Sequence, residues 1–229
     1  MCTKNRFAGI GLALGGCAAA ALLAAAVPAA QADTFGLQFA PAQGYTAYTG
    51  WASNVTAATF TPPLNFNATN TTVYTLGSSG ATFTITGGNY NVGGASGPTT
   101  NISYLTQAFF LGRATATPTT LTATLTGVSA ADRINFNFLQ SVQTGFEPAV
   151  SVNGSTPVAI NSDTTFVNAG TFSGSTSYSL TFTNAAGPTA GEFDLSGGLI
   201  SITPAPEPAA VGLLAVGAIG LLLLKRRPA

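Results

Sequence analysis

The chain has 229 residues, of which 46% are hydrophobic and 6% are charged, and this composition excludes an intrinsically disordered chain. Seven basic residues balance seven acidic ones, so we expect no basic surface and no nucleic-acid partner. The chain has no His, which removes the most frequent general base and metal ligand of enzymes.

The N-terminus has the layout of a secretory signal peptide. Lys4 and Arg6 precede an apolar run, 7–27, and the small residues Ala30 and Ala32 stand just before Asp33. We therefore predict a signal helix within residues 1–32, cut after Ala32 by signal peptidase, with Asp33 as the first mature residue. Because the apolar run is long, an uncleaved membrane anchor stays open as an alternative.

A second alternative to the cut after Ala32 is cleavage as a lipoprotein, and the positions of the two cysteines bear on it. The stretch Leu14-Gly15-Gly16-Cys17 resembles a lipoprotein cleavage site, but cutting there would leave an apolar mature N-terminus. Both cysteines, Cys2 and Cys17, precede Ala32. A cut after Ala32 therefore removes every thiol, and the mature domain must be stable without disulfides.

Residues 33–203 form the predicted domain, which contains 33 Thr, no Lys and several stretches of strict apolar/polar alternation. Alternation with period two is typical of half-buried antiparallel strands, and no interval shows an amphipathic helix. We predict strands at 34–40, 46–52, 57–61, 71–77, 81–87, 103–112, 119–128, 132–142, 148–153, 156–160, 176–184 and 191–202. We expect a hairpin at Asn153-Gly154 and a surface loop over 87–100.

Twelve strands are too many for one open sheet, so the predicted fold class is all-β, a two-sheet antiparallel sandwich. Several stretches resemble the jelly-roll domains of exported carbohydrate-binding proteins: Gly50-Trp51, 125–128 leading into 134–138, and 150–154. The resemblance implies a jelly-roll-like sandwich without a catalytic signature.

The C-terminus has three parts. Pro204, Pro206 and Pro208 form an extended strip, residues 209–224 are uncharged and apolar, and Lys225, Arg226 and Arg227 form a basic tail within 225–229. A hydrophobic helix over 209–224 would be about 24 Å long, shorter than a bilayer core of roughly 30 Å. Insertion is therefore marginal, which suits a temporary hold in a membrane during processing better than a permanent anchor.

This tail resembles the PEP-CTERM sorting signal of exported bacterial proteins, with Pro206-Glu207-Pro208 at the place of the motif and Lys225, Arg226 and Arg227 at its basic end. The resemblance implies processing by an exosortase in a Gram-negative bacterium that makes an exopolysaccharide. It also implies delivery to the cell surface or extracellular matrix. The alternative is an ordinary single-pass anchor after a proline linker.

Carboxylates are the only remaining candidates for chemistry. Glu192 and Asp194 lie two apart on a predicted strand and so share a face, as a glycosidase pair or a Ca²⁺ site requires. We favour simple solvation of an exposed strand face. Asp163 could supply a Ca²⁺ ligand, but an Asx turn is the simpler interpretation. We therefore expect no enzyme activity, no metal and no cofactor.

One segment combines Tyr45, Tyr48 and Trp51, the single tryptophan of the chain. Sugar rings stack on aromatic faces, so Tyr45 and Trp51, which share a face of an unbroken strand, are the candidate glycan contacts. The alternative is that Trp51 belongs to the core of the sandwich.

The threonine ladders of the domain allow two interpretations. Regular hydroxyl and methyl pairs could match an ice surface, but each ladder is short and they come from separate strands of a twisted sheet. The simpler interpretation is that Thr is a soluble strand former.

The sequence as a whole predicts a non-enzymatic surface or matrix protein with a structural or adhesive role in the exopolysaccharide. The alternative is a carbohydrate-binding module that binds the exopolysaccharide itself.

Overall fold

The structure is a computed structural model that describes residues 31–39, 48–61, 71–77, 79–86, 89–91, 98–102, 109–112, 120–141, 145–186, 191 and 193–205. All of its strands lie in one compact unit, Ala32–Pro204. The second unit, Met1–Gln31 with Ala205–Ala229, lies almost wholly outside the described residues, and so do the two predicted terminal helices. Within the described ranges, no helix is long and apolar enough to cross a membrane.

Seven strands form a first sheet, called sheet A, in the order β12-β9-β14-β1-β2, with β7 beside β14 and β6 beside β7. Its pairs are antiparallel except β1 with β2, which run parallel. The strands are β1 Asp33–Gln38, β2 Val55–Ala57, β6 Asn89–Asn91, β7 Phe109–Gly112, β9 Arg133–Gln140, β12 Val167–Phe172 and β14 Phe193–Thr203.

Seven further strands form sheet B, in the order β11-β10-β13-β8-β5-β4-β3, and every pair is antiparallel. The strands are β3 Thr59–Thr61, β4 Thr71–Leu76, β5 Ala81–Thr86, β8 Leu121–Thr126, β10 Pro148–Val152, β11 Val158–Ala159 and β13 Ser177–Asn184. The described part of the chain is therefore all-β in two sheets rich in antiparallel pairs, as predicted.

The alternating apolar residues of both sheets point into one shared core. Phe83, Leu125, Phe136 and Leu180, each from a different strand, are fully buried members of it. Their polar neighbours in sequence face outward, because successive side chains of a strand alternate between its faces. This confirms the prediction that the alternating sets face a common core.

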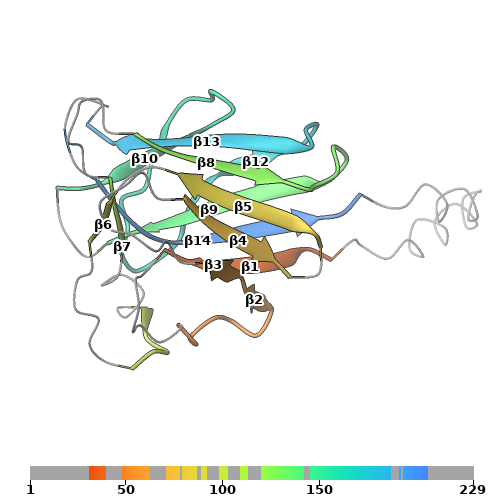
Figure 1. Cartoon of the computed structure of the whole chain (residues 1–229), viewed down its shortest axis with the longest axis horizontal. Coiled ribbons are helices and arrows are strands. Elements are labelled where there is room, and N and C mark those ends of the chain that lie inside the picture. The colour runs from red at the N-terminus through yellow and green to blue at the C-terminus, as the bar shows by residue number, and fades with distance from the viewer. Residues whose placement is uncertain are drawn as a thin grey trace, which may run out of the picture. The chain divides into compact units, whose positions relative to one another are not determined.

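Aromatic rings join the sheets across this core. Phe138 of sheet A meets Phe182 of sheet B edge to face at 5.0 Å between ring centroids. Phe39, which follows β1, lies 5.7 Å from Tyr74 and 6.3 Å from Phe83 of sheet B. The sheets therefore pack face to face as a sandwich, with β13, β8, β5 and β4 in front of β9 and β14 in Figure 1.

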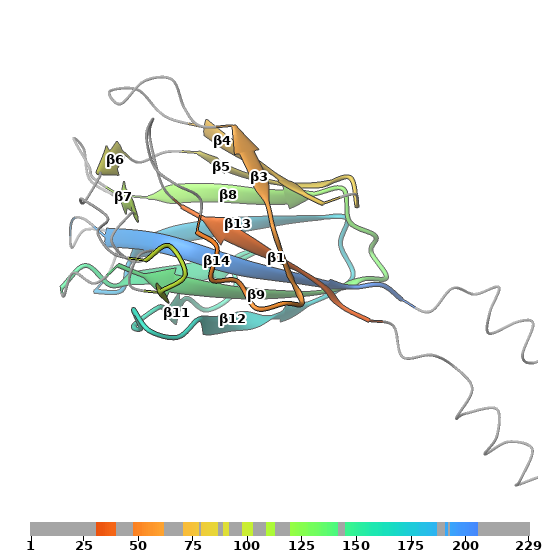
Figure 2. The same cartoon turned by 90° about the horizontal axis from the view of Figure 1, so that it is seen from below.

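The first and last strands lie side by side in the middle of sheet A. Asp33 at the start of β1 is opposite Ile202 near the end of β14. The chain therefore enters and leaves the two-sheet unit at the same end, where β1 and β14 reach the right side of Figure 2.

The predicted hairpin at Asn153-Gly154 is confirmed between β10 and β11. Both residues have positive φ, 49° and 75°, as the central residues of a type I′ turn require. Ser155 N donates to Val152 O at 2.9 Å and closes the turn.

Three sequence predictions differ from the structure. Residues 48–52, within the predicted strand 46–52, form no strand, and the next strand, β2, is the one that pairs with β1. The short strand β6 lies inside the expected loop 87–100. Strand β12 was missed because Gly170, at φ 127°, and a bulge beside it interrupt the alternation.

Candidate functional site

The candidate glycan residue Trp51 lies on the outer face of sheet A. Gly36 stands between Phe35 and Leu37, both buried in the core, so a side chain at Gly36 would point away from the core. A Cβ atom built there would lie 2.6 Å from Trp51 Cδ2. The indole therefore rests on the backbone of β1, outside the core of the sandwich, where only glycine leaves room for it.

Trp51 belongs to a small cluster, called here the aromatic cluster, that is separate from the main core. Its members are Tyr48, Trp51, Ile102, Leu139 and Phe166. Tyr48 meets Trp51 edge to face at 4.8 Å, and Phe166 lies 6.3 Å from Trp51 on a tilted plane. Leu139 and Tyr48 are buried, whereas Trp51 stays partly exposed.

Two segments far apart in the sequence meet to build the cluster. Thr49 N donates to Thr99 O at 3.0 Å, and the hydroxyls of the same two residues lie 3.0 Å apart. The segments fit closely, since a Cβ atom at Gly50 would lie 2.1 Å from Thr100 O. Residues 48–51 and 98–102 are therefore one packed layer over sheet A, an arrangement that strand periodicity could not predict.

Tyr48 makes two hydrogen bonds, one through its backbone and one through its hydroxyl. Its backbone N donates to Gln38 Oε1 at 2.8 Å, and its hydroxyl donates to Gly50 O at 3.2 Å. Burial raises the pKa of the Tyr48 phenol above its ordinary value of 10.0, because the charged form loses its hydration. Gln38 Nε2 is buried and makes no hydrogen bond, so both of its N–H donors are without an acceptor.

A polar strip extends across the outer face of sheet A beyond the cluster. Asn135 Nδ2 donates to Thr171 Oγ1 at 2.8 Å, and Asn137 Nδ2 donates to Asn135 Oδ1. The hydroxyls of Thr34 and Ser201 lie 2.9 Å apart. An aromatic ring beside amides and hydroxyls is the chemistry with which proteins bind sugars.

The expectation that Asp194 lies on an exposed strand face was wrong. The side chain is fully buried between the buried Phe193 and Leu195, and its Oδ2 accepts a hydrogen bond from Ser141 Oγ at 3.0 Å. The bulge of β14 between Leu195 and Gly197 offsets the faces at this end of the strand. Glu192 lies outside the described residues, so the structure does not test the candidate carboxylate pair.

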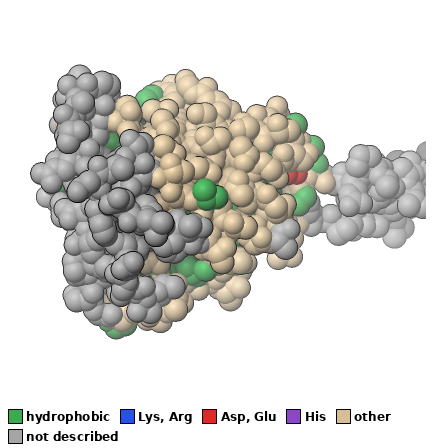
Figure 3. All heavy atoms as spheres, in the orientation of Figure 1, with side chains coloured by type: hydrophobic (Ala, Val, Ile, Leu, Met, Phe, Trp, Pro, Cys, Tyr) green, Lys and Arg blue, Asp and Glu red, His purple; other side chains and the backbone are tan. Residues whose placement is uncertain are grey.

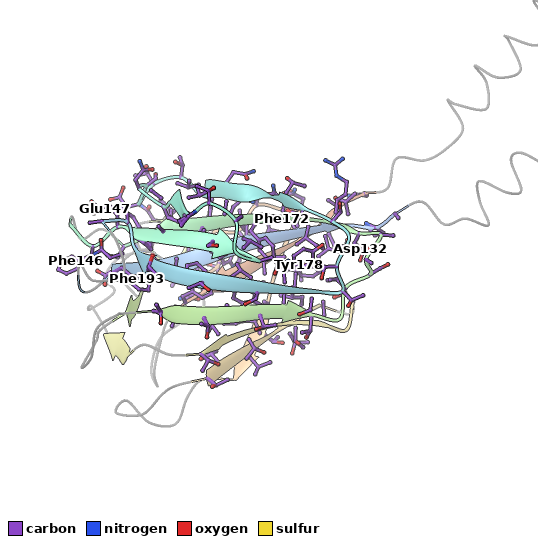
Figure 4. All side chains as sticks on the ribbon, turned by 90° about the horizontal axis from the view of Figure 1, so that it is seen from above. Asp132, Phe146, Glu147, Phe172, Tyr178 and Phe193 are labelled. Carbon is purple, nitrogen blue, oxygen red and sulfur yellow. The ribbon has the colours of Figure 1, made fainter. Side chains whose placement is uncertain are left out.

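Two other acids of the domain, Asp132 and Glu147, lie next to turns. Figure 4 shows Glu147 and Phe146 near Phe193 at one end of the sandwich and Asp132 at the other. Asp132 Oδ2 accepts from Ser129 N at 2.9 Å and Glu147 Oε1 from Gly145 N at 3.2 Å. Within the described ranges, no three potential metal-binding side chains come together.

The turn at Asp163 is held by its neighbour. Ser162 Oγ accepts from Thr165 N at 3.1 Å and from Thr164 N at 3.4 Å. The chain bends here, but the side-chain acceptor is the Ser162 hydroxyl and not the Asp163 carboxylate that an Asx turn requires.

Most other predicted site residues fall outside the described ranges. These are Tyr45, Ala30, Pro206, Glu207, Pro208, Lys225, Arg226 and Arg227. Ala32 and Asp33 are described, and both are exposed at the start of β1.

Comparison with known proteins identifies no relative. No protein-family model matches the chain, and neither a curated protein nor a solved structure matches it.

Proposed function

We propose that the chain is an exported, non-enzymatic protein of the cell surface or extracellular matrix of a Gram-negative bacterium, with a structural or adhesive role in the exopolysaccharide. A signal peptidase cuts after Ala32, and an exosortase-type enzyme acts at Pro206-Glu207-Pro208. The inner membrane holds the chain only in transit, through residues 209–224 and the basic tail.

The observation that carries this proposal is the position of the two strand ends. Strand β1 begins at Asp33, directly after the proposed first cut, and β14 ends at Thr203, three residues before Pro206. Ala32 and Pro204 are exposed. Both cuts would therefore leave all ladder hydrogen bonds of sheet A intact, and processing would cost the two-sheet unit no stability.

The order of the strands supports the jelly-roll form of the sandwich. A jelly roll of eight strands places the first, eighth, third and sixth in one sheet and the second, seventh, fourth and fifth in the other. The orders β1-β14-β9-β12 and β8-β13-β10-β11 fit this rule when the strands are taken in chain sequence. Strands β2 to β7 are then an insertion after the first strand.

Mass spectrometry of both termini of the protein recovered from its native cells tests this function. We expect an N-terminus at Asp33 and a C-terminus near Pro206. Substitution of Glu207→Ala would leave the N-terminal cut in place and block the C-terminal one. Recovery of the uncut chain from the cytosol would overturn the proposal.

A carbohydrate-binding module is the second candidate, and the position of Trp51 favours it. A tryptophan on the outer face of a sheet, partly exposed and beside a polar strip, is available to a ligand in a way that a core tryptophan is not.

Binding of the full chain to a glycan array distinguishes the two candidates. Saturable binding that is lost in Trp51→Ala and retained in Trp51→Phe would assign the aromatic cluster to a sugar. Thr84→Ala, on the outer face of sheet B, is the matched control and should bind like the native chain. If the chain binds no glycan of the array saturably, the structural or adhesive role is supported instead.

A further inference from the structure

The threonine ladders of sheet B come together as one two-dimensional array. Strands β4, β5, β8 and β13 are neighbours, and their outward residues are in register across all four. We call this array the threonine face. Its rows are Thr75-Thr82-Thr126-Ser177, Val73-Thr84-Thr124-Ser179 and Thr71-Thr86-Thr122-Thr181.

The composition of the threonine face is unusually uniform. Every position carries a hydroxyl except Val73, which is β-branched like Thr. All twelve side chains are exposed or partly exposed, and none is charged or aromatic. Figure 3 shows this side of the molecule, where uncharged polar side chains and backbone cover most of the region, a few hydrophobic side chains lie among them, and an acidic side chain appears only at one end.

Neighbouring hydroxyls on the face hold each other in place. Thr82 Oγ1 lies 3.0 Å from Thr126 Oγ1, and Thr71 Oγ1 lies 3.2 Å from Thr86 Oγ1. A β-branched side chain has few χ1 rotamers, and these pairs restrict it further. Each hydroxyl has one donor and two acceptor positions, so a bonded pair still offers hydrogen bonds to water.

The spacing of the face resembles that of crystalline water. In a regular antiparallel sheet, residues on one face repeat about every 6.8 Å along a strand and about every 4.8 Å between strands, and both values lie within about a tenth of the oxygen repeats on a prism face of hexagonal ice. The separate ladders of the sequence are thus a lattice in the folded chain.

We propose that the threonine face binds ice, with the ordered water of a prism face as its ligand. Methyl groups order the nearest water and hydroxyls hold it, while a neutral face matches a neutral lattice without desolvating any ion. A sugar is the less suitable ligand, since the twelve positions include no aromatic ring on which a sugar ring could stack. The proposal does not depend on how the chain is delivered.

The twist of sheet B limits how strongly the threonine face can bind ice. Adjacent strands rotate by about 20 to 25°, so the lattice match holds over neighbouring strands and is lost across the full width. We therefore expect inhibition of ice recrystallisation and shaping of ice crystals, with only a small thermal hysteresis.

Ice recrystallisation with the full chain in detergent, against the same detergent alone, tests the proposal. Thr124→Lys places a strongly hydrated charge at the centre of the face and should raise the inhibiting concentration about tenfold or more. The matched control is Thr171→Lys, on the edge strand β12 of sheet A, which should inhibit like the native chain. Thr124→Ser and Thr124→Val separate the contributions of methyl and hydroxyl.

Circular dichroism first establishes that the variants are folded, and the inhibition of ice recrystallisation is then compared among them. Inhibition by the native chain that Thr124→Lys weakens and Thr171→Lys does not supports the threonine face. Equal losses in both lysine variants, or no inhibition above the detergent blank, would overturn it. Should Thr124→Lys fail to fold, Thr122→Lys, at a more exposed position of the same face, provides the same comparison.

Discussion

The outer faces of the two sheets differ although both cover the same core. On sheet A, residues 48–51 and 98–102 form a packed layer, with Trp51 on Gly36 and a polar strip beside it. On sheet B, β4, β5, β8 and β13 carry repeated hydroxyls in register and no aromatic side chain among the twelve outward positions. Core packing restricts only inward residues, so the outer faces are where two different binding surfaces could arise.

The largest loss of stability should come from a substitution in the core that both sheets share. Phe138 lies between the sheets against Phe182, so Phe138→Ala should lower the free energy of unfolding by about 3 to 5 kcal/mol. Urea unfolding measures this loss. Equal stability of Phe138→Ala and the native chain would mean that the two sheets do not support each other.

The second largest loss of stability should come from a substitution on the outer face of sheet A. The Cβ atom of Gly36→Ala would lie 2.6 Å from the Trp51 ring and displace it, at a cost of about 1 to 3 kcal/mol. Tryptophan fluorescence should shift with it. In a double-mutant cycle with Trp51→Ala, most of this cost should disappear, and a cost that persists would place the strain elsewhere.

A pH-dependent effect should follow from Tyr48. Burial raises its folded-state pKa above 10.0, so the unfolded chain ionises first as the pH rises. The stability gained from neutral Tyr48 is therefore complete below pH 10.0 and is lost as the pH passes through the folded-state pKa.

Unfolding measured across alkaline pH, with Tyr48→Phe beside the native chain, checks this effect. The variant should lose the hydrogen bond to Gly50, about 1 kcal/mol, and the part of the alkaline destabilisation that belongs to Tyr48. Identical pH profiles of the two chains would contradict the assignment.

The smallest effect on stability should come from the threonine face. Thr84→Ala removes a partly exposed β-branched side chain, and the free energy of unfolding should change by about 0.5 kcal/mol or less. The same substitution should weaken ice recrystallisation inhibition. A large loss of stability would show that Thr84 serves the fold more than the face.

Strand periodicity predicted most of the core but little of the candidate site. Phe83, Leu125 and Phe138 were assigned inward by alternation alone, and the structure confirms them. Strand β12 escaped prediction because Gly170 and a bulge shift its alternation. Asp194 was expected on an exposed face, but a bulge in β14 shifts the alternation there. The order of residues in β14 does not show where the bulge lies.

The sequence by itself determined the all-β class, the two-sheet core and the candidate signals at both ends, because these depend on composition and on contacts between near neighbours. Only the tertiary structure decided which strands became neighbours. It brought Trp51 onto Gly36 and aligned Thr84 with Thr124, residues that lie far apart in the chain. The register between distant strands is set by the packing of the whole core, and no local pattern records it.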